Sequence, residues 1–183
     1  MCPGKRVVLA GDSAGGHLAL DLLLRGDGGG GPTCAAVLAV CPWFDLTHTS
    51  AAHTLNAGRD SVHLNLAEHG ASTYIAPKSG LAARRAASPA FSDKLGALPA
   101  RSLFVIVGER ECLRDDAETA AQTALAAGAP ADAIAIHTVD DSVWGAHCAL
   151  LLPLAETCSP AVRRAFDAMA SFVAEDALAR MRL

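Results

Sequence analysis

A serine in a glycine-rich segment near the N-terminus has the setting of a reactive nucleophile. Gly11-Asp12-Ser13-Ala14-Gly15 fits the pattern G-x-S-x-G, and Gly16 extends it. The segment lies between an apolar, β-branched run and a stretch with helical spacing, where this pattern forms a strained turn that exposes the serine hydroxyl. We expect Gly11 and Gly15 to be required because a Cβ at either would strike the neighbouring strand or helix. The pattern predicts Ser13 as the nucleophile of an acyl-transfer reaction.

The same turn predicts a place for negative charge. The helix expected from His17 onward would point its free N–H groups toward Ser13. The backbone N–H of Ala14 would donate to the oxyanion of a tetrahedral intermediate. Nucleotide-binding alternatives fail, because neither G-x-G-x-x-G nor G-K-[ST] is present in this segment.

A serine nucleophile also needs a general base, and the base needs a carboxylate that holds its tautomer. In enzymes that use this turn, the acid precedes the histidine along the chain. His147 is the only histidine that follows the last predicted strand, so we expect it to be the base. His137 lies inside that strand pattern and is interpreted as structural.

Four acidic residues just beyond the third predicted strand are candidates for the carboxylate that orients the histidine. They are Glu109, Glu111, Asp115 and Asp116. Glu109 follows the strand too closely, and the two aspartates fall in a first helical turn, where acids commonly satisfy the helix dipole. Glu111 is therefore favoured, and Asp115 stays open as the alternative.

These residues need a framework of parallel strands whose ends meet. Short apolar runs at 6–10, 34–41, 99–107 and 133–139 predict buried strands, and the segments 17–25, 114–127 and 160–181 predict helices. Their alternation predicts an α/β class, with a parallel sheet and right-handed crossovers, in a single domain over 1–183. Residues 43–87 form a long excursion, helical around 61–74, that we expect to lie near the acyl pocket.

Composition argues against several partners. The net charge is −4, with a single basic pair in the middle of the chain, so no nucleic-acid binding is expected. No apolar stretch is long enough to span a bilayer, and the four apolar residues before Gly11 are too few for a secretory signal, which predicts no membrane association and a cytoplasmic location. The six cysteines form no C-x-x-C pair, and four central histidines match no zinc spacing. Neither a metal site nor a cofactor is expected at His48, His53, His63 and His69 or elsewhere.

Five segments carry a family resemblance. They are GDSAGGHLAL at 11–20, PWFDLT at 42–47, SPAFSD at 88–93, GERECLRDDAE at 108–118 and the Gly-x-His of 145–147. Together they resemble the hormone-sensitive lipase family, also called α/β-hydrolase fold-3. The resemblance implies hydrolysis of short to medium acyl carboxylic esters without a cofactor, by Ser13, Glu111 and His147. Family members more often carry Asp at the acid position, and Gly-Phe where this chain has Cys148-Ala149.

The resemblance also implies what this sequence lacks. Family members begin with a lid, several strands and a His-Gly-Gly loop that completes the oxyanion hole, so we expect a partial α/β-hydrolase fold with about four mainly parallel strands. Losing an oxyanion donor costs about 2.7–4 kcal/mol, which predicts weak catalysis. Strand 6–10 would become an edge open to self-association. The last helix would be poorly covered along the apolar stripe Val162, Ala165, Phe166, Met169 and Phe172.

Three functions are compatible with these residues. The serine turn and His147 favour an active carboxylesterase that acts on a small-molecule ester. The missing loop favours an inert fragment or a ligand-binding member of the same fold. Peptidase or thioesterase activity would use the same three side chains.

Overall fold

The computed structural model describes residues 6–26, 33–75, 80–152 and 159–180, and within them four parallel strands form one sheet in the order β1-β2-β3-β4. The strands are β1 (Arg6–Asp12), β2 (Thr33–Val40), β3 (Leu103–Gly108) and β4 (Ile134–Val139). The predicted α/β class and all four strands are confirmed. β3 begins later than predicted because Arg101 has a φ of 59°, which a strand does not accommodate.

Six α-helices and three 3-10 helices connect or flank these strands in the described residues. The α-helices are α1 (Ala14–Arg25), α2 (Ala51–Leu55), α3 (Leu64–Ile75), α4 (Leu81–Ala87), α5 (Arg114–Ala126) and α7 (Pro160–Arg180). The 3-10 helices are Pro89–Phe91, Asp93–Ala97 and Ala149–Leu151. The excursion 43–87 is thus helical in three places, and α3 agrees with the predicted helical content.

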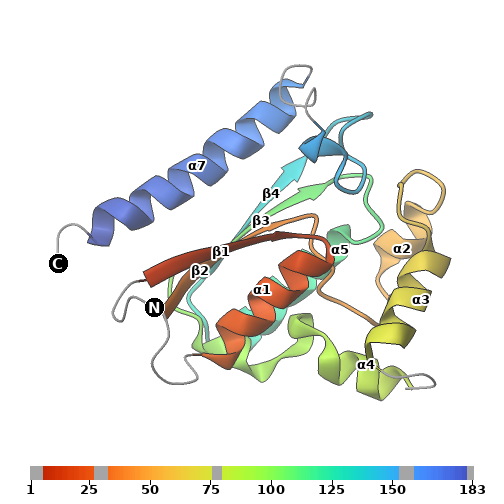
Figure 1. Ribbon diagram of the computed structural model, residues 1–183, viewed down its shortest axis with the longest axis horizontal. Coiled ribbons are helices and arrows are strands. Elements are labelled where there is room, and N and C mark those ends of the chain that lie inside the picture. The colour runs from red at the N-terminus through yellow and green to blue at the C-terminus, as the bar shows by residue number, and fades with distance from the viewer. Residues whose placement is uncertain (1–5, 27–32, 76–79, 153–158, 181–183) are drawn as a thin grey trace.

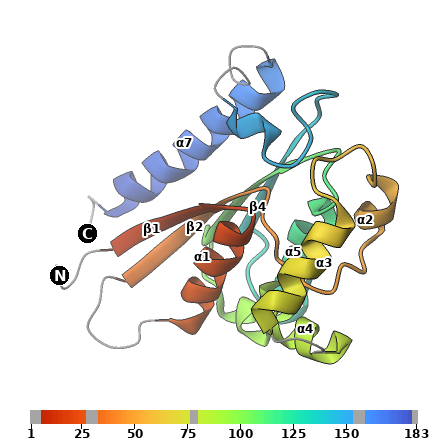
Figure 2. The same ribbon diagram turned by 45° about the vertical axis from the view of Figure 1, so that its right-hand side comes forward.

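The strand order explains how the helices divide between the two faces of the sheet. The strands follow each other in sequence order across the sheet, so right-handed crossovers place every connection on the same face. α1 and α5 cover that face, and α7 crosses the other one (Figures 1 and 2). Two apolar clusters result, one between the sheet and α1 with α5, and one beneath α7.

The last helix is better covered than the sequence predicts. Val162 and Ala165 are fully buried, and Phe172 packs on Phe104 of β3 with the ring centroids 5.3 Å apart. The prediction of a poorly covered stripe is wrong for these three residues of α7. Phe104 and Ile106 point from β3 toward the α7 face and supply the apolar surface that the helix covers.

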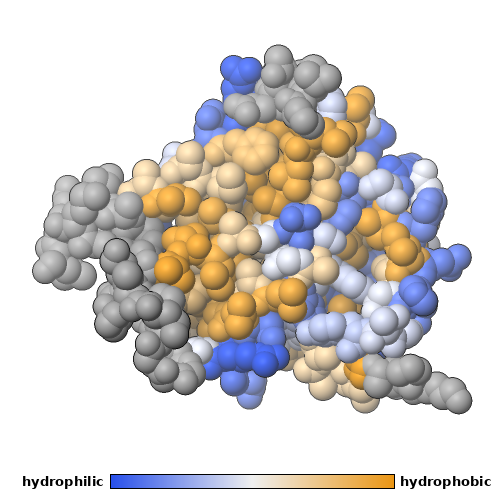
Figure 3. Space-filling model, in the orientation of Figure 1, coloured by the Kyte–Doolittle hydropathy of each residue, from blue (hydrophilic) through white to orange (hydrophobic). Residues whose placement is uncertain are grey.

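The edge of the sheet formed by β1 is less well covered than the face under α7. β1 pairs with β2 alone among the described strands, so it lies at an edge. Beside it, α1 leaves Leu18 and Leu22 half exposed, and Figure 3 shows apolar surface over β1 and α1. Self-association through this edge stays a prediction. Of the helices in the described part of the chain, none combines the length and the apolar character that crossing a bilayer would take.

Candidate active site

Ser13 stands at the junction between β1 and α1 with a left-handed backbone. Its φ is 49° and its ψ is −120°, as the glycine-rich turn predicts. The Ser13 N–H donates to the Val40 carbonyl at the end of β2 (3.0 Å), and the Ser13 carbonyl accepts from the Trp43 N–H (3.0 Å). These bonds tie the turn to the next strand, so the strained conformation is held by the surrounding backbone.

Of the two glycines predicted to exclude a side chain, Gly11 does so and Gly15 does not. A Cβ on Gly11 would collide with the backbone of Gly15, and a Cβ on Gly16 would lie 2.9 Å from the Cβ of Pro42. A Cβ on Gly15 would meet nothing within 4 Å. The prediction that Gly15 needs to be glycine for steric reasons is therefore wrong, because its Cα faces open space on the first turn of α1. Gly11 and Gly16 are the positions where the close approach of backbone excludes a side chain.

The three residues singled out for chemistry lie together at the carboxyl edge of the sheet. The Nε2 atom of His147 is 3.0 Å from the Oγ of Ser13, and its Nδ1 atom is 2.8 Å from Oε1 of Glu111. Glu111 is fully buried, and its Oε2 accepts from the N–H of Gly108 at the end of β3. This is the geometry in which a hydroxyl can pass its proton to an imidazole that a carboxylate orients.

The two aspartates among the other candidate acids bond to backbone elsewhere in the fold. Asp115 accepts from the N–H of Ala52 at the start of α2 (2.8 Å). Asp116 is fully buried, and its Oδ2 accepts from the N–H groups of Phe44 and Asp45 (3.1 and 2.9 Å). Both aspartates hold the segment that follows β2, in addition to lying in the first turn of α5.

Asp60, a buried residue in the excursion, links the loops of the acid and the base. Its Oδ1 accepts from the N–H of His147, and its Oδ2 accepts from the N–H of Cys112, each at 2.7 Å. Ser61 adds a bond from its hydroxyl to the His147 carbonyl (3.1 Å). Sequence reasoning missed Asp60 because no local pattern marks an acid that bonds backbone so far along the chain.

Cys148 and Glu111 shape the electrostatics of the imidazole. Burial alone would lower the pKa of His147, but hydrogen bonds and negative charge from Cys148 and Glu111 outweigh it and raise this pKa. A hydrogen bond with Cys41, helped by His147, lowers the pKa of the Cys148 thiol despite burial. The bond with Cys148 and then burial raise the pKa of Cys41. Both neighbours therefore favour the protonated form of the imidazole.

A free backbone donor is expected next to the serine. Ala14 is the first residue of α1, and the first N–H groups of a helix have no acceptor within the helix. The helix dipole adds partial positive charge at the same place. The N–H of Ala14 is thus placed to donate to an anion or a carbonyl oxygen beside Ser13.

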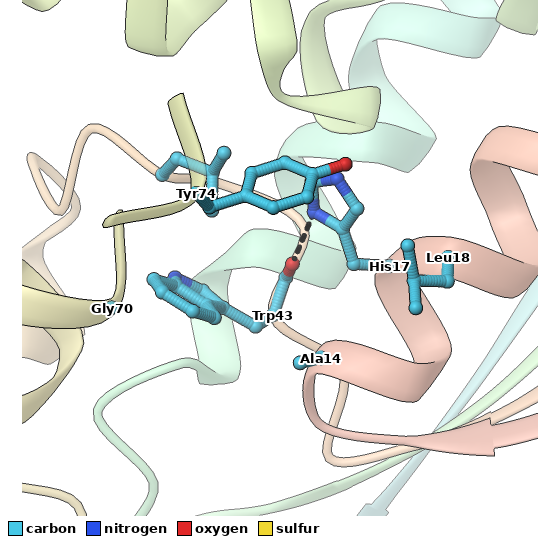
Figure 4. Close-up of a pocket in the computed structure, with 7 residues that line it drawn as sticks. Ala14, His17, Leu18, Trp43, Gly70 and Tyr74 are labelled. Atoms are coloured by element: carbon cyan, nitrogen blue, oxygen red, sulfur yellow. Dashed lines mark hydrogen bonds between the residues drawn. The ribbon is translucent and has the colours of Figure 1, made fainter. Parts of the chain in front are cut away.

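A small apolar pocket opens beside Ala14. It has a volume of about 240 Å³ and is lined by Ala14, His17, Leu18, Trp43, Leu46, Gly70 and Tyr74. Figure 4 shows the rings of Trp43 and Tyr74, from the segment after β2 and from α3, facing the same space as His17 of α1. The Nδ1 atom of His17 lies 3.0 Å from the Trp43 carbonyl, which holds the imidazole against the pocket wall.

The central histidines that raised the question of metal have other surroundings. His48 stacks on Trp43 with centroids 5.5 Å apart, and its Nε2 accepts from the indole N–H (3.1 Å). His53 packs edge-on against His48, and burial followed by the charge of His48 lowers the pKa of His53 to about 4. Neither belongs to a group of three ligand-bearing side chains within the described ranges.

Known proteins resemble this chain in sequence and in fold. A model of the alpha/beta hydrolase fold family matches residues 2–142. An acetyl-hydrolase from Streptomyces hygroscopicus is 40% identical over 134 residues, which are 70% of this chain and 42% of that protein. An esterase of the bacterial hormone-sensitive lipase family superposes with a TM-score of 0.63 at 31% identity, over 86% of this chain and 50% of its own. An esterase/lipase from an uncultured bacterium gives a TM-score of 0.62 at 25% identity, over 91% and 53%. The chain thus spans about half the length of these relatives.

Proposed function

This chain belongs to the α/β-hydrolase fold-3 family, that of the hormone-sensitive lipases, and we propose that it is a serine esterase that cleaves carboxylic esters with short acyl groups. The observation that carries the proposal is the continuous hydrogen-bonded array from Ser13 through His147 to Glu111. A resting serine in an ordinary turn has no need of a largely buried imidazole and a fully buried carboxylate behind it.

The proposed reaction has two halves. His147 takes the proton of Ser13 while Oγ attacks the ester carbonyl carbon, and the N–H of Ala14 donates to the oxygen that becomes negative. The imidazolium then protonates the departing alcohol oxygen, which leaves an acyl group on Ser13. A water molecule, deprotonated by His147, attacks this acyl-enzyme and releases the acid.

The size of the pocket beside Ala14 supports a short acyl group. Its volume of about 240 Å³ is below the range of ~300–1,000 Å³ that drug-sized ligands occupy. Leu46, Trp43 and Leu18 give it an apolar lining that suits an alkyl chain. The similarity to an acetyl-hydrolase supports the same size of acyl group.

Covalent labelling tests the proposal without requiring fast turnover. A fluorophosphonate probe should add to Ser13 once per chain, as intact mass and peptide mapping would measure. The Ser13→Ala variant should not be labelled, whereas Ser171→Ala, which removes an exposed hydroxyl on α7, should be labelled like the unsubstituted chain. Hydrolysis of p-nitrophenyl acetate should follow the same pattern.

Two results would reject the esterase. One is a chain that is folded by circular dichroism and is not labelled. The other is equal labelling of Ser13→Ala, which would assign the reactivity to another side chain. Thermal stabilisation by an ester without labelling would favour the alternative of a ligand-binding member of the same fold.

A further inference from the structure

Two thiols lie beside the imidazole of the proposed base. One ligand atom from each of Cys41, His147 and Cys148 can be chosen so that the three lie within 4.8 Å of one another. In the described part of the chain they are the only such group of three His, Cys, Asp or Glu side chains. None of the reaction steps proposed above uses either thiol.

The backbone holds these side chains in place. Cys41 follows β2 directly, and its N–H donates to the Ile106 carbonyl of β3 (2.7 Å). The N–H of Cys148 donates to the sulfur of Cys41 (3.3 Å), so the two cysteines are already in contact. Cys41 is buried and Cys148 is half-buried, which leaves an approach from solvent on the Cys148 side.

We propose that Cys41, His147 and Cys148 form a binding site for a thiophilic divalent cation such as Zn²⁺, and that the bound ion switches off Ser13. Two thiolates and one imidazole are a donor set that suits zinc, and three protein ligands leave the fourth tetrahedral position to water. Binding releases the protons that the thiols and the imidazole carry to the solvent.

The distances fit an ion after a small closure. Zinc lies about 2.3 Å from sulfur and 2.0–2.1 Å from nitrogen, so tetrahedral ligand atoms are roughly 3.5–3.8 Å apart. The three atoms here are at most 4.8 Å apart, so an approach of at most about 1.3 Å completes the site. Rotation of the Cys148 side chain, which faces Asp12 with its sulfur 4.0 Å from the carboxylate, can supply part of that movement.

The switch follows because both nitrogen atoms of the His147 imidazole already have a partner in the proposed reaction. One nitrogen of His147 faces Ser13 and the other faces Glu111. A metal–nitrogen bond uses the lone pair of one of them. If the ion takes Nε2, Ser13 loses its proton acceptor, and if it takes Nδ1, Glu111 no longer orients the ring. This step rests on the proposed esterase function, whereas binding itself does not.

Titration with Cd²⁺ tests binding by itself. Cadmium bound to thiolates gives an ultraviolet charge-transfer band, and we expect one equivalent to develop it in the full chain under a non-thiol reductant. Cys148→Ser and Cys41→Ser should each weaken binding at least ~10-fold. Cys34→Ser, which changes a thiol elsewhere on β2, should bind like the unsubstituted chain. No band, or a band that persists in both site variants when circular dichroism shows them folded, overturns the site.

Fluorophosphonate labelling tests the switch. One equivalent of Zn²⁺ should slow the labelling of Ser13 at least ~10-fold, and EDTA should restore it. In Cys148→Ser, zinc should leave the labelling rate unchanged. Undiminished labelling of the zinc-bound chain overturns the switch. A metal-free chain that is never labelled counts against the esterase, and the cadmium titration then still decides the metal site.

Discussion

Replacing Glu111 by glutamine is a sharp test of the proposed triad, because the side chain keeps its size and loses one acceptor. Glu111 is fully buried, and its two oxygens face different partners. Oε1 faces the Nδ1 atom of His147 at 2.8 Å, and Oε2 accepts from the N–H of Gly108. An amide has one oxygen, so it can serve only one of the two.

The size of the effect follows from the two ways in which the amide can lie. With its NH₂ toward Gly108, two buried donors face each other at a cost of about 1–3 kcal/mol. With its NH₂ toward His147, it favours the tautomer that carries hydrogen on Nε2, which cannot accept the proton of Ser13. Either way the bond to a charged carboxylate is lost, at about 1.5–3 kcal/mol. Together these effects raise the barrier by ~2.5–6 kcal/mol, which corresponds to acylation slowed ~10²–10⁴-fold.

The assay is the second-order rate of fluorophosphonate labelling at Ser13, read by intact mass. Glu109→Gln makes the same chemical change at an exposed position two residues away and should label normally. Asp115→Asn tests the alternative acid. Labelling of folded Glu111→Gln within about threefold of the unsubstituted chain, or a ~10²-fold loss in Asp115→Asn instead, would refute the assignment of Glu111.

Four further predictions concern the serine turn, the clamp that Asp60 forms by bonding the backbone of His147 and of Cys112, the pocket and pH. Gly11→Ala should lower the melting temperature and abolish labelling, because its Cβ collides with the Gly15 backbone. Gly15→Ala should fold normally and gain up to ~1 kcal/mol of stability from helix propensity. An equal loss of stability in the two variants would contradict this. Asp60→Asn should slow labelling about 10-fold or more, because an NH₂ then faces the N–H of His147 or of Cys112; an unchanged rate would show that the clamp does not position the base. Gly70→Leu should fill the pocket beside Trp43. The kcat/KM for p-nitrophenyl butyrate, divided by that for p-nitrophenyl acetate, should then fall at least ~10-fold. A constant ratio would place the acyl group elsewhere. Burial and His48 lower the pKa of His53 from 6.5 to about 4 in the folded chain. Between these two pH values the unfolded chain binds a proton that the folded chain does not, so the free energy of unfolding should fall by up to ~3 kcal/mol as the pH drops from 6.5 toward 4. Urea unfolding across this range should show the fall, and His53→Gln should flatten it.

Sequence reasoning succeeded where the signal is local. The strand before Ser13 and the helix after it follow from a few neighbouring residues. It was wrong at Gly15, and it offered no steric reason for Gly16, because the residue that excludes a side chain there is Pro42 of another segment. It placed Asp116 correctly in a first helical turn but missed its two hydrogen bonds to the backbone after β2. Such contacts between distant segments have no periodicity or spacing from which to read them.

The excursion after β2 contributes to the geometry of the site as much as the strands do. Ser13 and Glu111 are anchored by strand ends, since Ser13 bonds Val40 and Glu111 bonds Gly108. His147 lies in a loop after β4, and a loop alone positions a base poorly, because one free torsion moves a ring nitrogen out of bonding range. Asp60 replaces that freedom with two backbone bonds of 2.7 Å, one to His147 and one to Cys112 beside the acid. A substitution in the excursion can therefore change the rate of the proposed reaction through the distance between base and nucleophile, without touching any of the three reacting side chains.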